Sequence, residues 1–242
     1  MFMNNEIKIT IDKKYLNELE NIMSQNNLTS YSKSVEKLIH ENSPKYKDIP
    51  YERFLISNRR YMGSKTKLLN FIDESIKDVI GEYSSFVDIF SGTGVVGSYF
   101  NKENVSIISN DLLYSNYITN TAFLSSEQFD YKKIDDIIVN YNNLKGEENY
   151  FSKSFGNKFF SSDIANKIGS IREDIEKRFK KNEINFREKA ILITSLIYAS
   201  DKIANTCGHY DAYRDNVEFK TNFSLKHLDI FHNKNIGNKY KK

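Results

Sequence analysis

The chain has 242 residues, a net charge of +3 and a single cysteine; 39% of its residues are apolar or aromatic and 28% are charged. This composition is typical of a globular protein with one sizeable core and room for a small appended segment. It excludes an internal disulfide, and no apolar run approaches the roughly 20 residues of a membrane span. The four histidines and the cysteine show no metal-binding spacing, so no metal site is predicted. The first residues lack a signal-peptide pattern, and we expect a soluble, cytoplasmic protein without membrane contact.

The N-terminal residues predict one strand and two short helices. Residues 6–11 alternate between polar and apolar side chains, which is typical of a half-buried strand. Residues 15–23 carry an apolar stripe at helical spacing, and a second helix is predicted from about residue 30 to residue 39. So few elements cannot bury this stripe alone. The segment is therefore expected to pair with a second copy or to pack on the main domain.

Over residues 5–42 this pattern resembles the ribbon-helix-helix family of DNA-binding proteins. The resemblance implies a homodimer whose paired strands enter the major groove of DNA. It assigns base contacts to Glu6, Lys8 and Thr10, and a phosphate contact to the start of the second helix at Thr29 and Ser30. The alternative is a plain β-α-α extension. We assign residues 1–43 to this DNA-binding or dimerisation segment and residues 44–58 to a charged linker bracketed by two prolines.

Residues 59–69 combine a turn with positive charge. The run Tyr61-Met-Gly-Ser-Lys65 places a lysine directly before a helix predicted over about residues 66–80. Such a turn can present Lys65 to an anion. Six apolar residues are expected on the buried side of that helix, namely Leu68, Leu69, Ile72, Ile76, Val79 and Ile80.

The stretch from Phe86 to Asp111 predicts the first half of a nucleotide-binding βαβ unit. One apolar run ends at Asp88 and breaks into a glycine-rich turn that reopens as a helix. A second apolar run ends at Asp111, 23 residues after Asp88. Glycines at 92 and 94 allow a sharp turn and a close approach of a ligand to the backbone. Asp111 is placed to accept both hydroxyl groups of a ribose.

Three motifs in this region together resemble those of the adenine-specific DNA methyltransferases, in particular the Dam-like (D12) branch. They are Tyr61-Met-Gly-Ser-Lys65, Asp88-Ile-Phe-Ser-Gly-Thr-Gly94 and Asn110-Asp111, and their order and spacing match over about residues 59–124. The resemblance implies a Rossmann-like class I α/β fold that binds S-adenosylmethionine. A positive Lys65 suits the carboxylate of that cofactor, an acid at Asp88 suits its ammonium group, and Asp111 suits its ribose.

The cofactor-binding residues implied by the resemblance lie in residues 59–128. They are Tyr61, Gly63, Lys65, Asp88, Phe90, Ser91, Gly92, Thr93, Gly94, Asp111 and Leu112. The run Gly92-Thr-Gly-Val-Val-Gly97 also fits the fingerprint of dinucleotide-binding dehydrogenases. Those enzymes need neither an acid inside the first strand nor the preceding lysine motif, so the methyltransferase interpretation is favoured.

Residues 129–242 are predicted to form a helical insertion or target-recognition region with a basic tail. The polar residues 129–158 indicate one short helix in an inserted loop, and apolar periodicity predicts helices over about residues 164–179 and 186–203. Residues 205–214 mix aromatic, basic and small side chains, which can stack on bases and contact phosphate. The residues expected to contact DNA here are His209, Tyr210, Tyr213 and Arg214. Cys207 is interpreted as a small buried residue, because adenine N6 methylation uses no covalent enzyme intermediate.

The catalytic motif of the family, Asp/Asn-Pro-Pro-Tyr/Phe, does not occur in these residues, whose two prolines are Pro44 and Pro50. In the family this motif hydrogen-bonds the amino group of a flipped-out adenine and stacks on its ring. We therefore expect no catalytic residue in this chain. The fold is expected to be incomplete, with the missing part supplied by a second polypeptide or lost by truncation. The predicted function is site-specific adenine methylation of double-stranded DNA, in restriction-modification or host DNA marking. The alternative is a non-catalytic, dimeric DNA-binding regulator.

Overall fold

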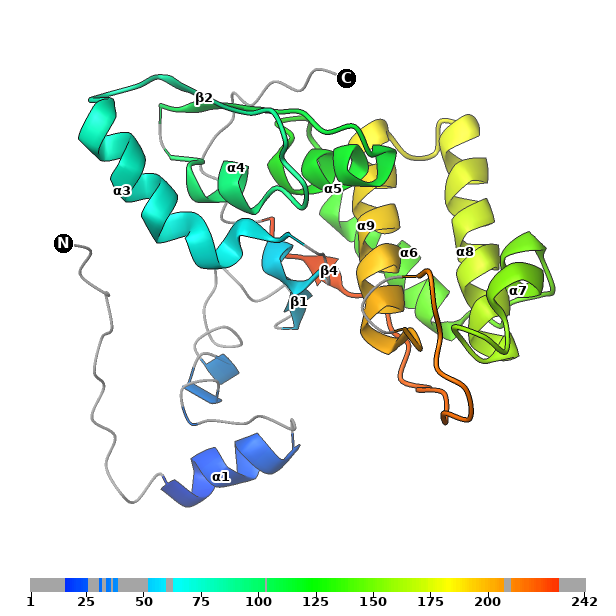
Figure 1. The fold of residues 1–242 in the computed structure, drawn as a ribbon. Helices are drawn as coiled ribbons and strands as arrows, with labels where there is room; N and C mark the ends of the chain where they lie inside the picture. The colour runs from blue at the N-terminus through cyan, green and yellow to red at the C-terminus, as the bar shows by residue number, and fades with distance from the viewer. Residues whose placement is uncertain are drawn as a thin grey trace. The chain divides into compact units, whose positions relative to one another are not determined.

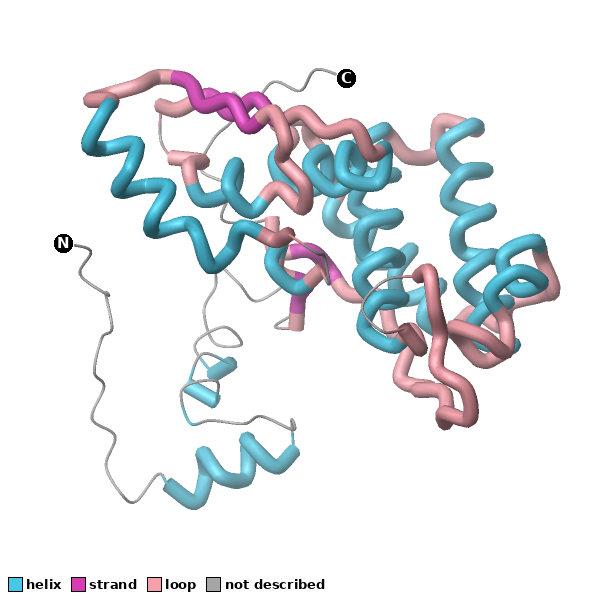
Figure 2. Tube along the Cα trace, in the orientation of Figure 1, coloured by secondary structure: helices cyan, strands magenta, loops and turns pink. Residues whose placement is uncertain are grey.

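The computed structural model describes residues 16–25, 31, 34–35, 37–38, 52–59, 63–102, 104–206 and 210–230. The chain divides into two compact units, Met1–Glu52 and Arg53–Lys242. In Figure 1 the described helices and strands are coloured along the chain, and in Figure 2 by secondary structure. The described helices include none that is long and apolar enough to cross a membrane.

The first unit contains helix α1, Leu16–Gln25, in the region where the apolar stripe predicted a helix. Leu19 is buried on this helix, and the hydroxyl of Tyr31 donates a hydrogen bond to the carboxylate of Glu20 over 2.9 Å. Tyr31 and residues 34–35 and 37–38 of this unit are also helical. The strand predicted over residues 6–11 lies outside the described residues, so the ribbon-helix-helix resemblance stays a prediction.

The centre of the second unit is a parallel pair of strands, β2 (Ser85–Asp88) and β3 (Ser106–Ser109), with Phe86 opposite Ile107. The glycine loop and the short helix α4, Val95–Tyr99, connect them. The predicted strand-loop-helix-strand order is confirmed, and Asp88 is the last residue of β2. Both carboxylates, Asp88 and Asp111, therefore lie at the carboxyl end of the sheet, where ligands of open α/β sheets bind.

One face of this small sheet packs on helices. Ile107 is fully buried, and the ring of Phe86 stacks on Phe100 with a centroid distance of 4.3 Å. Helix α3 (Leu69–Val79) follows a 3₁₀ turn, η3 (Lys65–Leu68), and helix α5 (Tyr114–Leu124) follows β3. In Figure 1 helices α3, α4 and α5 all lie on the same side of β2.

Half of the apolar stripe predicted for α3 is not buried. Leu69, Ile72 and Ile76 pack against the core as expected. The prediction was wrong for Leu68, Val79 and Ile80, all of which are exposed in the structure. The buried residue of this helix is Asp73, which the Nζ of Lys77 contacts at 2.7 Å, so the inward face is more polar than periodicity indicated.

The remainder of the second unit is helical. Helix α9, Phe186–Ile203, has the predicted bounds and packs against α5 and against α8, Ser162–Lys180. Residues 129–158, predicted to carry one short helix, contain two, α6 (Tyr131–Asn143) and α7 (Tyr150–Phe155). Asparagine and aspartate caps begin both, with Asp130 accepting a hydrogen bond at α6 and Asn149 at α7.

A second parallel pair joins the two ends of this unit. Strand β1, Arg53–Phe54, pairs with β4, His227–Leu228, and Arg53 lies opposite His227. A 3₁₀ turn, η2 (Ile56–Asn58), continues from β1, and its Ile56 carbonyl accepts a hydrogen bond from the hydroxyl of Tyr198 on α9 over 2.9 Å. Helices combined with two small parallel sheets agree with the predicted α/β class.

Candidate functional site

The glycine loop after β2 has a backbone that only glycine adopts readily. Gly92 and Gly94 have φ values of +53° and +86°, in the left-handed region. A Cβ atom on Gly94 would lie 2.7 Å from Oδ1 of Asn120. Both glycines are thus required by the turn itself, and at position 94 also by the packing of α5 beneath it.

Hydrogen bonds tie this loop to the end of β3. The backbone N–H and the hydroxyl of Ser91 both donate to the carbonyl oxygen of Asn110, over 3.0 and 3.1 Å. The amide of Asn110 donates in return to the carbonyl of Ile89 over 3.0 Å. Ser91 and Thr93, both expected to bind the cofactor, are buried, and the Ser91 hydroxyl helps to join the loop to the end of β3.

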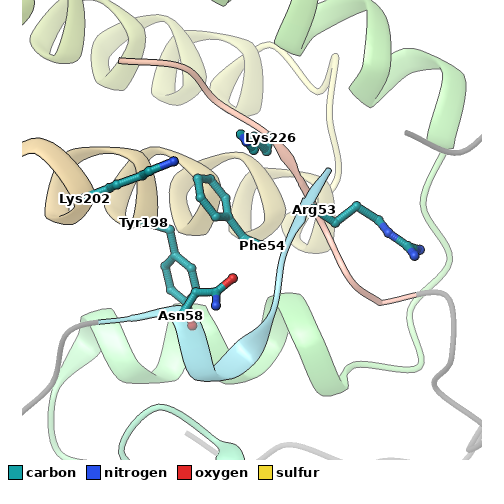
Figure 3. A pocket seen from close by; sticks show the side chains of 6 residues that line it. All are labelled: Arg53, Phe54, Asn58, Tyr198, Lys202 and Lys226. Atoms are coloured by element: carbon teal, nitrogen blue, oxygen red, sulfur yellow. The ribbon is translucent and has the colours of Figure 1, made fainter. Parts of the chain in front are cut away.

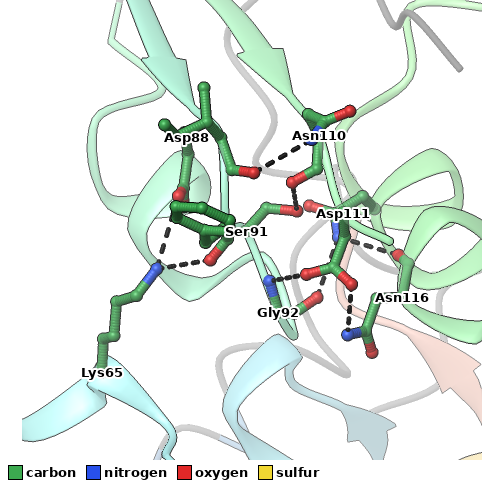
Figure 4. Close-up of polar contacts among 10 residues, drawn as sticks. Lys65, Asp88, Ser91, Gly92, Asn110, Asp111 and Asn116 are labelled. Carbon is green, nitrogen blue, oxygen red and sulfur yellow. Dashed lines mark hydrogen bonds and ion pairs between the residues drawn. The ribbon is translucent and has the colours of Figure 1, made fainter. Parts of the chain in front are cut away.

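Asp111 accepts three hydrogen bonds within the protein (Figure 4). Its Oδ2 accepts from the N–H of Gly92 over 2.8 Å, and its Oδ1 accepts from the N–H of Leu113 over 2.9 Å and from the amide of Asn116 over 3.0 Å. A carboxylate has about four acceptor positions, so one remains, on Oδ2. Burial alone would raise the pKa of Asp111, but these donors, together with the charge of Lys65, hold that pKa below its ordinary value. The group is a carboxylate at neutral pH.

Lys65 and Asp88 lie on the other side of the loop (Figure 4). The Nζ of Lys65 donates to the carbonyl of Phe90 over 2.6 Å and lies 3.4 Å from Oδ1 of Asp88. Oδ2 of Asp88 is buried and has no hydrogen-bond partner among the described residues. A buried acceptor without a donor is unfavourable, so this atom favours a cationic or N–H-bearing ligand.

Apolar side chains beside these charges are exposed. Phe90 is 74% exposed and Leu112, which follows Asp111 directly, is 97% exposed. Gly63 has φ +80°, with open space where a Cβ would lie. Tyr61, expected to close over the cofactor, lies outside the described residues. The loop therefore combines a cation, two carboxylates and exposed apolar surface, which suits a ligand that carries opposite charges, a hydroxyl group and a flat ring.

Three residues of this arrangement had no role in the sequence interpretation. Asn116 and Asn120, four residues apart on α5, are buried, and the amide of Asn120 donates to the carbonyl of Gly92 over 3.0 Å. Arg59 donates to Oδ1 of Asn116 over 2.8 Å. Two asparagines at helical spacing in an otherwise buried helix are unusual, and that spacing is the signal that could have identified them.

The residues expected to contact DNA are partly described. The rings of Tyr210 and Tyr213 both lie 5.4 Å from the ring of Phe159, and each is a little over two-fifths exposed. Arg214 is exposed as well. His209, Lys8 and Thr10 lie outside the described residues, as does Cys207.

A basic cavity of about 310 Å³ lies between β1, α9 and the segment before β4 (Figure 3). Its lining residues are Arg53, Phe54, Asn58, Tyr198, Lys202 and Lys226. The guanidinium of Arg53 forms an ion pair with Asp229 at 3.1 Å, and in Figure 3 it points away from Phe54.

The described residues include no group of three or more His, Cys, Asp and Glu side chains that could hold a metal ion.

Comparison with known proteins agrees with the arrangement around the glycine loop. The model of a family described as D12 class N6 adenine-specific DNA methyltransferase matches residues 61–241. The modification methylase LlaI of Lactococcus lactis subsp. lactis is 36% identical over 172 residues, 64% of this chain and 27% of that protein. The type II methyltransferase M.NlaIII of Neisseria lactamica is 29% identical over 65% of this chain and 50% of its own length. M.FokI, the type II methyltransferase of Planomicrobium okeanokoites, is 32% identical over 72% of this chain and 30% of its length.

The chain thus spans between about a quarter and a half of the length of these relatives. No solved structure gives a significant match.

Proposed function

Because the chain belongs to the D12 class N6 adenine-specific DNA methyltransferase family, we propose that it binds S-adenosylmethionine at the glycine loop and takes part in methylating N6 of adenine in double-stranded DNA. The observation that carries the proposal is the convergence of Lys65, Asp88 and Asp111 on this one loop. The relatives' names, modification methylases and type II methyltransferases, support a role in restriction-modification or host DNA marking. The β2–β3 pair would then be part of a Rossmann-like sheet.

The groups at the loop fit the proposed cofactor. The buried, unpartnered Oδ2 of Asp88 suits an ammonium group, and the Nζ of Lys65 suits a carboxylate. The remaining acceptor position on Asp111 suits one ribose hydroxyl; a second hydroxyl would have to displace one of the three present donors. The exposed side chains of Phe90 and Leu112 suit the adenine ring. When bound, the cofactor supplies an electrophilic methyl group.

The chemistry at the target base needs further groups. A flipped-out adenine must have its amino group hydrogen-bonded and its ring stacked. The family's motif for this purpose, acid or amide followed by Pro-Pro-aromatic, does not occur in the 242 residues. We propose that a polypeptide with these residues alone binds the cofactor without transferring its methyl group, and that a polypeptide carrying the motif restores transfer.

Calorimetry and methyl transfer test these statements separately. S-adenosylmethionine titrated into the purified chain should give heat, and Asp111→Ala should weaken binding at least tenfold; absence of heat in the wild type would refute the cofactor site. In the second assay, tritiated cofactor and an adenine-containing duplex are added with and without a polypeptide carrying the motif. Label should enter DNA only in its presence, and label incorporated by the chain alone would refute the proposed division of labour.

For the DNA we propose contacts by Tyr210, Tyr213 and Arg214, which are exposed on one segment, and by His209. The first unit, with Lys8 and Thr10, is proposed as a second DNA-binding element that dimerises through residues 5–42. Deleting residues 1–43 should then convert a dimer into a monomer in sedimentation experiments and leave cofactor affinity unchanged. If the sedimenting mass of the deletion variant is still that of two chains, the dimer proposal is refuted.

A further inference from the structure

A buried side-chain amide is one of the three donors that hold Asp111. Asn116 is fully buried on the first turn of α5, and its Nδ2 donates to Oδ1 of Asp111 over 3.0 Å. Its other end, Oδ1, accepts from Nη1 of Arg59 over 2.8 Å. A side-chain amide has an acceptor at one end and donors at the other, so its orientation decides whether it attracts or repels the carboxylate.

Arg59 fixes that orientation. A guanidinium carries donors and no acceptor, so the amide oxygen must face Arg59 and the amide nitrogen must face Asp111. The reverse orientation would place an oxygen against the carboxylate and an N–H against the cation. The Arg59 side chain is only 12% exposed, so water competes little for these contacts.

Arg59 has a second contact that leads away from the loop. Its Nε lies 3.8 Å from Oδ2 of Asp201, near the end of α9. Oδ1 of Asp201 accepts a hydrogen bond from the hydroxyl of Tyr210 over 3.1 Å. A continuous path therefore runs from the exposed Tyr210 through Asp201, Arg59 and Asn116 to Asp111, and it joins residues that are up to 151 positions apart in the sequence.

We infer that Arg59 is a positioning residue that holds Asp111 through the amide of Asn116, and that Asp201 and Tyr210 extend this path so that DNA bound at Tyr210 tightens cofactor binding at Asp111. The inference rests on the proposed function, because it takes Asp111 as a cofactor-binding group. Neither Arg59 nor Asn116 needs to touch the cofactor. A contiguous set of contacts can carry coupling between two sites when both ligands bias it, and the four interactions above are contiguous.

A double-mutant cycle tests the positioning role. S-adenosylmethionine is titrated calorimetrically into the full chain as wild type, Arg59→Gln, Asp111→Asn and the double variant. Arg59→Gln should weaken binding about tenfold, which corresponds to roughly 1.4 kcal/mol. In the Asp111→Asn background the same change should have less than about a twofold effect, because the group that Arg59 positions is already altered. Equal losses in both backgrounds would overturn the inference.

Two variants separate positioning from general stability. Arg53→Gln removes a comparably buried arginine, paired with Asp229 on the neighbouring β1–β4 sheet, and should leave cofactor affinity unchanged. Arg59→Lys keeps the charge but cannot contact Asn116 and Asp201 in the same fork, and should bind with intermediate affinity. If Arg59→Gln does not fold, Arg59→Lys takes its place in the double-mutant cycle with Asp111→Asn. Heat in the wild type together with wild-type affinity in Arg59→Gln overturns the positioning role, whereas no heat in the wild type overturns the cofactor site itself.

Two matched tyrosine variants test the proposed coupling between DNA binding and cofactor binding. Tyr210→Phe removes the hydroxyl that contacts Asp201 but keeps the ring beside Phe159, and Tyr213→Phe makes the same change on the other ring that lies 5.4 Å from Phe159. Cofactor affinity is measured with and without a pool of random-sequence duplexes. Wild type and Tyr213→Phe should bind the cofactor several-fold more tightly with DNA, and Tyr210→Phe should lose that gain. An equal gain in Tyr210→Phe, or none in the wild type, would overturn this extension.

Discussion

Replacing Gly94 by alanine should destabilise the second unit by about 2–4 kcal/mol. At φ +86° a residue with a Cβ costs about 1–2 kcal/mol. The new Cβ would also lie 2.7 Å from Oδ1 of Asn120, so that amide must move and lose its hydrogen bond to the carbonyl of Gly92. The amide keeps its second hydrogen bond, to the carbonyl of Asn116, and losing the first without replacement costs roughly 1–3 kcal/mol. Alanine also lowers the entropy of the unfolded chain, which returns about 0.4–1 kcal/mol.

Gly63 supplies the matched control. Its φ of +80° is nearly the same, but nothing lies within 4 Å of a Cβ added there. Gly63→Ala should therefore show the backbone strain alone, a net loss of about 1 kcal/mol. Urea denaturation of the full chain measures both losses, and calorimetry with S-adenosylmethionine shows whether the displaced Gly92 carbonyl also weakens binding.

The difference between the two variants is the decisive quantity. If Gly94→Ala is destabilised no more than Gly63→Ala, the contact with Asn120 does not add to the backbone strain, and the packing of α5 beneath the loop does not constrain position 94. If both variants keep the stability of the wild type, the left-handed backbone itself would be in doubt.

Further changes test other parts of the second unit. Lys65→Met should weaken cofactor binding at least tenfold in calorimetry by removing a charge-assisted contact, while Lys67→Met in the same 3₁₀ turn should not. Glu188→Ala should lower the free energy of unfolding by about 2–4 kcal/mol, because its buried carboxylate accepts from the N–H of Asn185, which caps α9, and from the N–H of Asp130 before α6. Lys133→Ala, which removes the half-exposed ion-pair partner, should cost less because both N–H donors remain; equal losses of stability would argue against this role of the two N–H contacts. Burial lowers the pKa of His227 more than Asp135 raises it, so the imidazole binds a proton more readily in the unfolded chain than in the folded one. The contribution of His227 to the free energy of unfolding should be complete above about pH 6.5 and should decrease as the pH drops below that value. A His227→Gln variant whose urea midpoint changes in the same way from pH 7.5 to 5 would argue against this contribution.

Local patterns predicted the parts of this fold that local sequence determines. Periodicity located α8 and α9, and the apolar runs ending in acids located β2 and β3. The β1–β4 pair was not predicted, because Arg53 and His227 are 174 residues apart and each strand has two residues, too few for an alternating pattern. The sequence predicted one helix in residues 129–158 where the structure has two, because aspartate and asparagine caps in a polar segment also fit a loop.

The candidate site also contains both residues that local sequence patterns identify and residues that they do not. The glycines and acids of the loop could be named from sequence, because such residues at fixed spacing are typical of a nucleotide-binding turn, and their role in cofactor binding stays a prediction. Asn116 and Arg59 were not assigned, because their importance comes from what they contact. Asn116 lies on the first turn of α5, after Asp111, and Arg59 comes from a different part of the chain. Sequence reasoning identifies groups that can meet a ligand more readily than groups that orient other groups.

The end of β2 exposes apolar side chains that its sequence pattern would predict to be buried. Strands of parallel sheets are usually buried on both faces, and apart from Asp88 the run from Phe86 to Phe90 is apolar on both. Phe86 packs inward, but among the described residues nothing buries Val87, Ile89 or Phe90, each more than half exposed. Any segment or ligand that covers these side chains removes apolar surface from water at about 25 cal/mol per Å² and restrains the loop that starts at their end. Because the loop also holds Lys65 and Asp111, covering this face and binding the cofactor should favour one another.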